Sequence, residues 1–336
     1  HSGHFESLES RELMAIIGTF QGGHWNIDAN DDKVFDDFGQ GDVQAEFGGR
    51  KDIPITGDWT GGGTDQIGTF RAGLWRLDSN QNFRWDGVAG GDTELRFGRT
   101  SDVPVVGDWD GDGIAQIGTF TSGVWRLDVN QNGIWDGPSG GDAQFNFGAM
   151  GATPVVGDWN ADGIVDVGVY QSFGQRWRVD SNGDRVWDPK DGDQEFRFYR
   201  GLPVTGEWMD AGLSAVGQFQ KGTWYVDLNG NERFDQAGGD AAWRFGSKGA
   251  KPVVFESIST GNFNNRPPVL DPIGDKFIIE GFQLTFGATA GDPDSADTLT
   301  FTLSAGAPAG ANIEPDTGIF AWTPSANQGP ATYDVT

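Results

Sequence analysis

Hydrophobic and polar side chains alternate in short runs along most of the chain. Trp125 and Leu127 fall on one face of an extended segment while Arg126 falls on the other, and Phe145 and Phe147 share a face in the same way. This two-residue period is typical of antiparallel strands that bury one face. No segment has a convincing helical period, so we expect an all-β protein.

These alternating segments belong to a repeat that occurs five times. It is marked by a short strand of the Ile-Gly-Thr-Phe type. The five copies of this strand, at intervals of 49 or 50 residues, are Ile17–Phe20, Ile67–Phe70, Ile117–Phe120, Val167–Tyr170 and Val216–Phe219. In each copy there follow a Trp-containing strand, an acidic loop, an alternating strand and a strand of the Pro-Val-Val type. Four short strands in a unit of this length predict one blade of a β-propeller.

The order of the strands favours a closed ring. The first copy begins at Ile17 without a preceding Pro-Val-Val strand, and the last copy ends in Pro252–Ser257 without a following Ile-Gly strand. Pairing of these two segments would remove two exposed strand edges. We therefore predict a five-bladed β-propeller of four-stranded repeats over residues 17–258, with an open stack of repeats as the alternative.

The remaining segments are divided by composition. Residues 1–16 precede the repeats, residues 259–268 read as a linker, and residues 269–336 alternate in the manner of a β-sandwich. The strands expected in this sandwich are Phe277–Ile279, Leu284–Phe286, Leu299–Leu303 and Ile319–Trp322. The chain starts at His1 and stops in what reads as a strand, so we expect a longer native polypeptide and a sandwich truncated at its C-terminus.

Twelve of the 14 tryptophans occupy repeated positions. They form three sets: Trp25, Trp75, Trp125, Trp177 and Trp224; Trp59, Trp109, Trp159 and Trp208; and Trp85, Trp135 and Trp187. Large aromatic side chains at repeated positions are usually core, and we interpret them as packing between blades. A set that faced solvent could instead stack on carbohydrate.

The clearest chemical pattern is a nine-residue loop with carboxylate or amide oxygens at positions 1, 3, 5 and 9. The five copies are Asp28, Asn30, Asp32 and Asp36; Asp78, Asn80, Asn82 and Asp86; Asp128, Asn130, Asn132 and Asp136; Asp180, Asn182, Asp184 and Asp188; and Asp227, Asn229, Asn231 and Asp235. Calcium takes roughly 6–8 oxygen ligands, and alternate side chains of a tightly curled loop can converge on one ion. We therefore predict Ca²⁺ in these loops. The alternative is that Asp and Asn serve only as turn formers.

Two further features extend the predicted ligand set. A later aspartate in each copy could supply the ligand that the distal Glu gives in an EF-hand loop: Asp42, Asp92, Asp142, Asp193 and Asp240. A second loop, after the Pro-Val-Val strand, carries acidic positions in two copies: Asp108, Asp110 and Asp112, and Asp158, Asn160, Asp162 and Asp166. The other copies are degraded, with Asp58, Thr60 and Gly62 in one and Glu207, Met209 and Ala211 in another, so we expect two ions at most in these second loops.

Composition agrees with a cation-binding protein. There are 23 basic and 49 acidic residues, for a net charge of −26. This charge opposes binding to nucleic acid and to anionic membranes, and five divalent ions would offset about ten of the negative charges. Cysteine is absent, which excludes disulfides and thiolate chemistry. No run of about 18 apolar residues suggests insertion into a membrane.

The repeat resembles a known family. Phe97-Gly98, the stretch from Val105 to Gly113 (Val-Val-Gly-Asp-Trp-Asp-Gly-Asp-Gly) and Ile117-Gly118 are similar to the FG-GAP/VCBS-type repeat. This resemblance covers residues 17–258 and implies a calcium-binding β-propeller of the kind found in surface and adhesion proteins.

Both ends of the chain also carry resemblances. Asn265-Arg-Pro-Pro268 and Asp316–Pro324 resemble the cadherin-like Ig modules of bacterial surface proteins, over residues 265–336. In related modules, acidic groups bind calcium between domains, which makes Glu280, Asp292, Asp294 and Asp297 candidates, with solvated turn carboxylates as the alternative. Residues 5–15 resemble a leader motif of planctomycete extracellular proteins.

These residues bear on three classes of function. The first is a non-catalytic structural or adhesion protein at the cell surface, whose partners would be other surface proteins, further copies of itself or glycans. The second is a calcium-dependent lectin-like propeller. The third, an enzyme, is disfavoured because the acids recur at equivalent positions, whereas a glycosidase needs a singular pair, and because the only histidines are His1, His4 and His24. We expect the first, at an extracellular location.

Overall fold

A computed structural model gives the fold of the chain. It describes residues 15–35, 42–208, 213–258, 269–270, 273–274, 276–291, 301–303, 307–329 and 331–333. The leader-like residues 5–14 and the linker 259–268 lie outside the described residues. The chain forms two compact units, His1–Gly261 and Asn262–Thr336.

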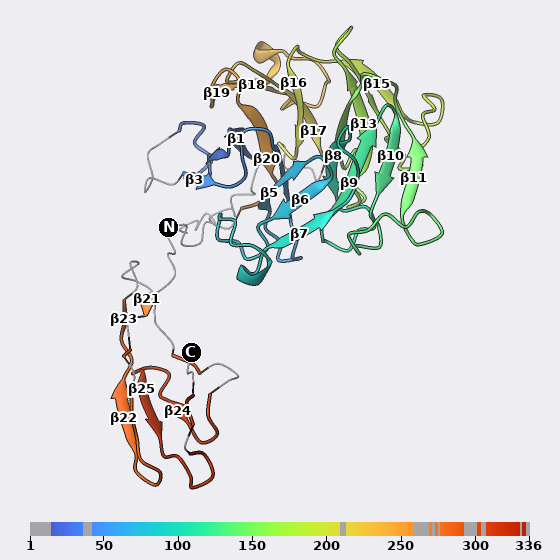
Figure 1. Ribbon diagram of the computed structural model, residues 1–336. Coiled ribbons are helices and arrows are strands. Elements are labelled where there is room, and N and C mark those ends of the chain that lie inside the picture. The colour runs from blue at the N-terminus through green and yellow to red at the C-terminus, as the bar shows by residue number, and fades with distance from the viewer. Residues whose placement is uncertain are drawn as a thin grey trace, which may run out of the picture. The chain divides into compact units, whose positions relative to one another are not determined.

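The first unit contains five four-stranded antiparallel sheets (Figure 1). The first strands of the sheets, of the Pro-Val-Val type, are β20 (Lys251–Phe255), β4 (Ile53–Gly57), β8 (Val103–Gly107), β12 (Thr153–Gly157) and β16 (Leu202–Gly206). The second strands are β1 (Ile16–Gln21), β5 (Gln66–Arg71), β9 (Gln116–Thr121), β13 (Asp166–Gln171) and β17 (Ala215–Gln220). The third strands are β2 (His24–Ile27), β6 (Leu74–Leu77), β10 (Val124–Leu127), β14 (Arg176–Val179) and β18 (Thr223–Val226). The fourth strands are β3 (Val43–Glu46), β7 (Thr93–Arg96), β11 (Ala143–Asn146), β15 (Gln194–Arg197) and β19 (Ala241–Arg244).

The first sheet is assembled from segments far apart in the sequence. Strand β20 pairs antiparallel with β1, with Ile17 opposite Val254 and Thr19 opposite Pro252, and the sheet continues through β2 to β3. The predicted pairing of the Ile17 strand with the last Pro-Val-Val strand is therefore confirmed. The other four sheets, numbered second to fifth, each follow chain order, beginning at β4, β8, β12 and β16.

The first strands of the sheets also contact one another. The neighbours run in the order β4, β8, β12, β16 and β20, and β20 in turn contacts β4.

Burial within the strands follows the predicted alternation. Trp125 and Leu127 are buried while Arg126 is half-buried, because the third strand presents alternate side chains to opposite faces. The predicted core position of the first tryptophan set is confirmed, since these five side chains are fully buried. Four of them donate their indole N–H to the carbonyl of the phenylalanine that follows the fourth strand, as Trp125 does to Phe147 at 2.9 Å.

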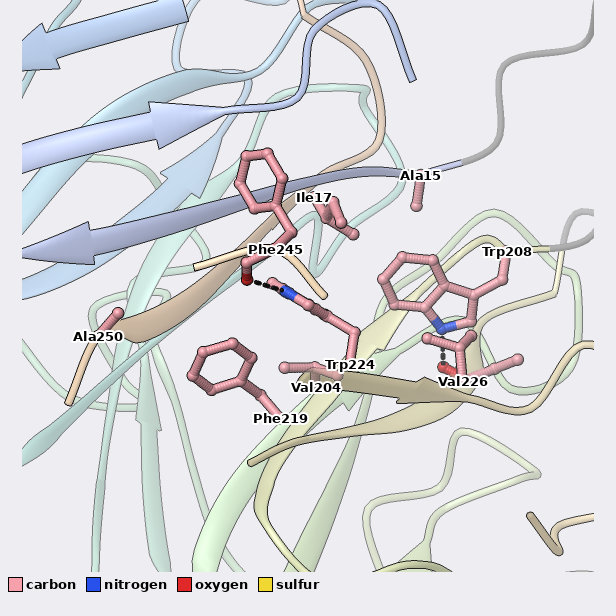
Figure 2. Packing of buried hydrophobic residues seen from close by; sticks show 10 residues of the cluster. Ala15, Ile17, Val204, Trp208, Phe219, Trp224, Val226, Phe245 and Ala250 are labelled. Carbon is pink, nitrogen blue, oxygen red and sulfur yellow. Dashed lines mark hydrogen bonds between the residues drawn. The ribbon is translucent and has the colours of Figure 1, made fainter. Parts of the chain in front are cut away.

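The core continues from sheet to sheet. Ala15 and Ile17 at the start of β1 lie in one apolar cluster with Trp224 and Phe245 of the fifth sheet (Figure 2). Trp208, on the same cluster, donates its indole N–H to the carbonyl of Ala215 at 3.1 Å. Neighbouring sheets therefore share a hydrophobic interior, which stabilises them by roughly 25 cal/mol per Å² of apolar surface buried.

Within the described residues, helix is limited to two single-turn 3-10 segments, Val88–Gly90 and Gln236–Gly238, which the sequence did not predict. Both belong to the acidic loops before a fourth strand. No helix in the described part of the chain is both long and apolar enough to cross a membrane.

The described part of the second unit contains two small antiparallel sheets. One joins β22 (Leu284–Gly287), β25 (Ile319–Trp322) and β24 (Asn312–Ile313), and the other joins β21 (Val269–Leu270) and β23 (Ala290–Gly291). Two predicted strands, at Leu284–Phe286 and Ile319–Trp322, are confirmed. Phe286 and Phe320 stack between them with ring centroids 4.8 Å apart.

Two other predicted strands are wrong or only partly described. Residues 277–279 form no strand, and Phe277 and Ile279 remain 91% and 73% exposed. Their apolar run does not alternate, so it sets no single face apart for burial. Of the strand predicted at 299–303, residues 301–303 have no regular structure, and the rest lies outside the described residues.

Candidate metal centre

Each nine-residue loop follows the third strand of its sheet and is organised by its first aspartate. These five aspartates are among the most deeply buried polar residues of the first unit, from 0% to 3% exposed: Asp28, Asp78, Asp128, Asp180 and Asp227. In every copy, one carboxylate oxygen accepts the backbone N–H of position 6 at 2.7–3.0 Å. The first aspartate therefore ties the loop to the end of the strand.

Positions 3 and 5 act on the backbone in the same repeated way. The side-chain oxygen of position 3 accepts the N–H of position 5 at 3.0–3.2 Å. The side-chain oxygen of position 5 accepts the N–H of position 7 at 2.7–2.9 Å. These contacts are the Asx turns named above as the alternative to metal binding, and all five loops make them.

The backbone of each loop is curled by left-handed residues at positions 4 and 6. Most of these are not glycine; they include Gln81 and Phe83 of the second loop, both at φ 62°. A bulky residue such as Phe83 takes this conformation at a cost, so the loop must be held by surrounding contacts. All five loops adopt this conformation at both positions.

The structure brings predicted ligands together most clearly in the second and third loops. The amides of Asn80 and Asn82 both contact the Asp86 carboxylate, and Asn132 donates to Asp136 at 3.0 Å. Asn130 reaches Asp136 at 3.5 Å. Positions 3, 5 and 9 therefore face a common space in these two loops.

The other three loops are joined in part. Asn30 contacts Asp32 at 3.2 Å and Asn182 contacts Asp184 at 3.4 Å. The carboxylate of Asp188 accepts the N–H of Lys190 at 2.9 Å, and Asn231 bonds only backbone groups among the described contacts. Asp36, at position 9 of the first loop, lies outside the described residues.

The later aspartates close the loops by hydrogen bonding to the backbone of position 9. In the second to fifth loops, one oxygen of this residue accepts the N–H of position 9: Asp92, Asp142, Asp193 and Asp240. Their side chains are buried, at 3–6% exposed. The second carboxylate oxygens of Asp92 and Asp142 have no hydrogen-bond partner among the described residues, and neither has one oxygen of Asp180. A buried carboxylate oxygen without a donor is costly, and a cation would satisfy it.

Burial acts on the charge of these groups. It raises the pKa of Asp28 and of Asp78 to about 6, and it raises the pKa values of Asp128, Asp180 and Asp227 as well. The carboxylates nearby, such as Asp92 and Asp86 beside Asp78, add to the effect. In the first loop the charge of Lys33 partly offsets the burial of Asp28. In the other loops the ionised carboxylates are unfavourable without a positive partner, and a divalent ion would supply one.

The two best copies of the second loop bring several of their predicted ligands close together. Carboxylate oxygens of Asp108, Asp110 and Asp112 lie within 4.8 Å of one another. In the other copy, Asp158 accepts the N–H of Gly163 at 2.9 Å and Asn160 donates to Asp166 at 3.2 Å.

Among the carboxyl groups of these second loops, Asp166 has the pKa that departs furthest from the ordinary value. Burial, followed by the carboxylates of Asp180 and Asp162, raises the pKa of Asp166 to about 7. The equivalent position in the third sheet is Gln116, whose amide donates to Asp110 at 2.7 Å. The amide of Gln116 therefore supplies a hydrogen-bond donor in the third sheet, which an ionised Asp166 carboxylate cannot supply in the fourth.

Of the two degraded second loops, the one at Asp58 is described throughout and the one at Glu207 only in part. Asp58 keeps the same capping role, accepting N–H groups from Thr60, Gly62 and Gly63. Met209 and Ala211 lie outside the described residues, as do the candidates Asp292, Asp294 and Asp297. Glu280 is described and exposed, and among the described residues it belongs to no group of three or more side chains that could ligate a metal.

Sequence reasoning missed the way the loops connect neighbouring sheets. The aromatic residue at position 8 packs edge-on against the phenylalanine of the preceding sheet, with centroids 5.9–6.3 Å apart. These pairs are Phe35–Phe245, Trp85–Phe47, Trp135–Phe97, Trp187–Phe147 and Phe234–Phe198. The fixed spacing of this aromatic residue, next to the position 9 aspartate, was the available signal.

The third tryptophan set is thus half-buried between sheets. Arg76, Arg126 and Arg178 also lie over Trp85, Trp135 and Trp187 respectively, at 5.0–5.8 Å from the ring centroids. The predicted packing role is confirmed for these rings.

Comparison with known proteins identifies the second unit. Residues 267–336 match the protein family described as "Putative Ig domain", in agreement with the resemblance noted above. No curated protein and no solved structure matches the chain. The chain is therefore an all-β protein with repeated four-stranded antiparallel sheets followed by an Ig-like domain.

Proposed function

We propose that the chain is a non-catalytic, calcium-stabilised extracellular protein that acts in surface assembly or cell attachment. The observation that carries the proposal is the fivefold repetition of one oxygen-lined loop, with the same buried aspartate and the same backbone contacts in every sheet. Buried carboxylate oxygens without donors at Asp92, Asp142 and Asp180 support a cation over a simple turn.

The proposal includes the architecture of the first unit. We infer that its five sheets are the blades of one closed β-propeller of the FG-GAP/VCBS type. The pairing of β20 with β1 and the sequence of neighbours among the first strands support closure. A closed ring has no exposed central strand edges, which suits a protein outside the cell.

A bound calcium ion would stabilise the packing between neighbouring sheets. The ion would fix positions 1, 3, 5 and 9, and position 8 lies between two of these and reaches the next sheet. Binding would therefore stabilise contacts between blades as well as the loop itself. Other surface proteins, further copies of the chain and glycans are the partners that this role would serve.

Calcium titration with and without chelator tests the proposal. Ions that bind only the folded state stabilise it by mass action, at about 2.7 kcal/mol per site when the free ion exceeds Kd a hundredfold. For several sites, EGTA should lower the Tm of the first unit by roughly tens of degrees. Equal ionic strength in NaCl is the control for general screening of the negative charge. A Tm that EGTA leaves unchanged, with no calcium bound in equilibrium dialysis, would refute it.

A further inference from the structure

The connections between strands sort into two ends of the first unit. Because each sheet is antiparallel, the loops from first to second strand and from third to fourth strand leave one end of it, which we call the loop end. The hairpins from second to third strand and the turns from a fourth strand to the following first strand leave the opposite end, which we call the turn end. The hairpins are residues 22–23, 72–73, 122–123, 172–175 and 221–222, and the turns are residues 47–52, 97–102, 147–152, 198–201 and 245–250.

The loop ends of neighbouring sheets are joined to one another. The N–H of Asp65 donates to the Ser257 carbonyl at 2.9 Å, and the N–H of Glu256 donates to the Asp65 carboxylate at 2.7 Å. At the other four junctions, the residue before a second strand donates its N–H to the carbonyl that follows the first strand of the preceding sheet, at 2.8–2.9 Å: Ala115 to Asp58, Val165 to Asp108, Ser214 to Asp158 and Ala15 to Glu207.

The turn ends meet in the same way. Thr121, at the end of β9, donates its hydroxyl to Asp102 in the turn of the preceding sheet. Ser247, in the turn of the fifth sheet, donates to Gln21 at the end of β1 at 2.8 Å. Loop ends therefore gather on one side of the unit and turn ends on the other.

The two sides carry opposite charge. The loop end holds the acidic loops, and the loop of the fourth sheet alone has two basic residues and five acids: Asp180, Asp184, Asp188, Asp191 and Asp193. The turns and hairpins have six basic residues, all exposed: Arg50, Lys51, Arg99, Arg200, Lys221 and Lys248. The acids of these turns and hairpins are Asp52 and Asp102, which are buried and accept backbone N–H groups of their own turns.

Large apolar side chains are exposed on both sides. At the turn end, Met150 is 84% exposed and Phe173 is 97% exposed. The hairpin that carries Phe173 has four residues where the other hairpins have two. At the loop end, Val88, Ile134 and Val186 are exposed among the acids. Exposed apolar side chains beside charged ones are typical of protein–protein interfaces.

We propose that the turn end of one copy of this chain binds the loop end of a second copy, head to tail. The exposed Lys and Arg side chains face the loop carboxylates of the second copy, and Met150 and Phe173 pack against its exposed apolar side chains. Charge complementarity selects a second copy as the partner, because the same chain supplies a surface of each sign. The contact joins two different surfaces, so it can repeat from copy to copy into a filament. It rests on the proposed function and deepens it, by naming the chain itself as the partner in surface assembly.

Sedimentation velocity of the full chain, in about 20 mM and about 500 mM NaCl, tests the contact. The wild type should associate in low salt and dissociate in high salt, because salt screens exposed charges. Lys221→Glu/Lys248→Glu reverses two charges of the turn end and should weaken association by about tenfold or more.

The matched control is Arg84→Glu/Arg233→Glu, which makes the same change of net charge at exposed positions of two acidic loops. It should associate at least as tightly as the wild type, since it adds negative charge to the side that is already negative. A monomeric wild type in low salt, or equal weakening by the two variants, would overturn the proposal.

A mixing experiment tests the head-to-tail arrangement. Ile134→Lys/Val186→Lys blocks the loop end, and Lys221→Glu/Lys248→Glu blocks the turn end. Their equimolar mixture should form dimers but no longer assemblies, about tenfold more tightly than either variant alone, because each variant keeps one intact surface. Association of either variant alone as tight as in the mixture would refute the arrangement.

The outcome is separable from that of the calcium titration. A chain that associates as described but binds no calcium in equilibrium dialysis would refute the calcium sites and leave this contact standing. A chain that binds calcium but stays monomeric would do the reverse. Heparin binding that Lys221→Glu/Lys248→Glu lowers, with self-association unchanged, would show an anionic polysaccharide at the turn end and overturn the proposal.

Discussion

At the scale of single residues, the glycine of each Phe-Gly pair is fixed by two constraints at once. Gly98 lies at φ 89°, in the left-handed region, and a Cβ built on it would meet Cγ2 of Thr119 in the next sheet at 2.6 Å. Gly48, Gly148 and Gly246 meet the corresponding residue of their neighbours at the same distance. The Phe-Gly motif is therefore a sheet-to-sheet contact as well as a turn.

We expect Gly98→Ala to destabilise the first unit by about 2–4 kcal/mol, because it adds a steric clash to the cost of the left-handed backbone. The matched control is Gly151→Ala, where φ is 81° but no atom lies within 4 Å of the added Cβ. The control should cost about 1 kcal/mol. Urea unfolding of both variants measures the difference, and equal losses would show that the clash is absent.

At the scale of elements, each acidic loop serves two sheets, its own and the one before it. Loss of the third loop should therefore destabilise the second sheet as well, because Trp135 of this loop packs on Phe97 of that sheet. Replacement of Asp128 and Asp136 by Ala removes the strand tie and the position 9 carboxylate together.

For Asp128→Ala/Asp136→Ala in calcium, we expect amide hydrogen exchange to accelerate most in β10, β11 and the neighbouring strand β7. Protection should change least in the fifth sheet, which the third loop does not contact among the pairs described. Peptide-level exchange by mass spectrometry reads this directly. Uniform loss around all five sheets would contradict a local role for the loop.

The sequence predicted the strands of the first unit well, because the period-2 pattern, the glycine turns and the repeat spacing agree with one another. It failed at Phe277–Ile279, where an apolar run without alternation carried no information about a partner strand. Loop composition pointed to Asn80, Asn82 and Asp86 as a group, and the two asparagines contact the Asp86 carboxylate through their amide N–H groups rather than through their oxygens. The acids at Asp65 and Glu256 could not be paired from sequence, since 191 positions separate them and only the joining of β20 to the first sheet brings them together.

At the scale of the whole molecule, the charge of −26 makes stability depend on what neutralises it. If the proposed calcium sites are occupied, protons and calcium compete for the same buried carboxylates. Asp28 and Asp78, with pKa values raised to about 6, favour the protonated form when the protein is folded without metal.

The metal-free protein should therefore lose stability as the pH rises from 5 to 8, since these raised pKa values lie above the unfolded ones. The proposed calcium sites require the ionised form, so the gain in Tm on adding calcium should grow over the same range. Differential scanning calorimetry with EGTA or calcium at each pH checks both trends. A calcium-induced gain that shrinks toward pH 8 would argue against carboxylate ligands.

The joining of β20 to β1 also has a consequence for synthesis on the ribosome. Strand β1 emerges early, but its partner is made more than 200 residues later, which at about 5–20 residues per second leaves its edge unpaired for roughly 10–50 seconds. During that interval the Pro-Val-Val segments at 104–106 and 154–156 are nearly identical rivals for the same edge. Correct assembly then requires each of these segments to pair with its own second strand, β9 or β13, before it can pair with β1. The local hairpins must therefore form faster than the nascent chain lengthens.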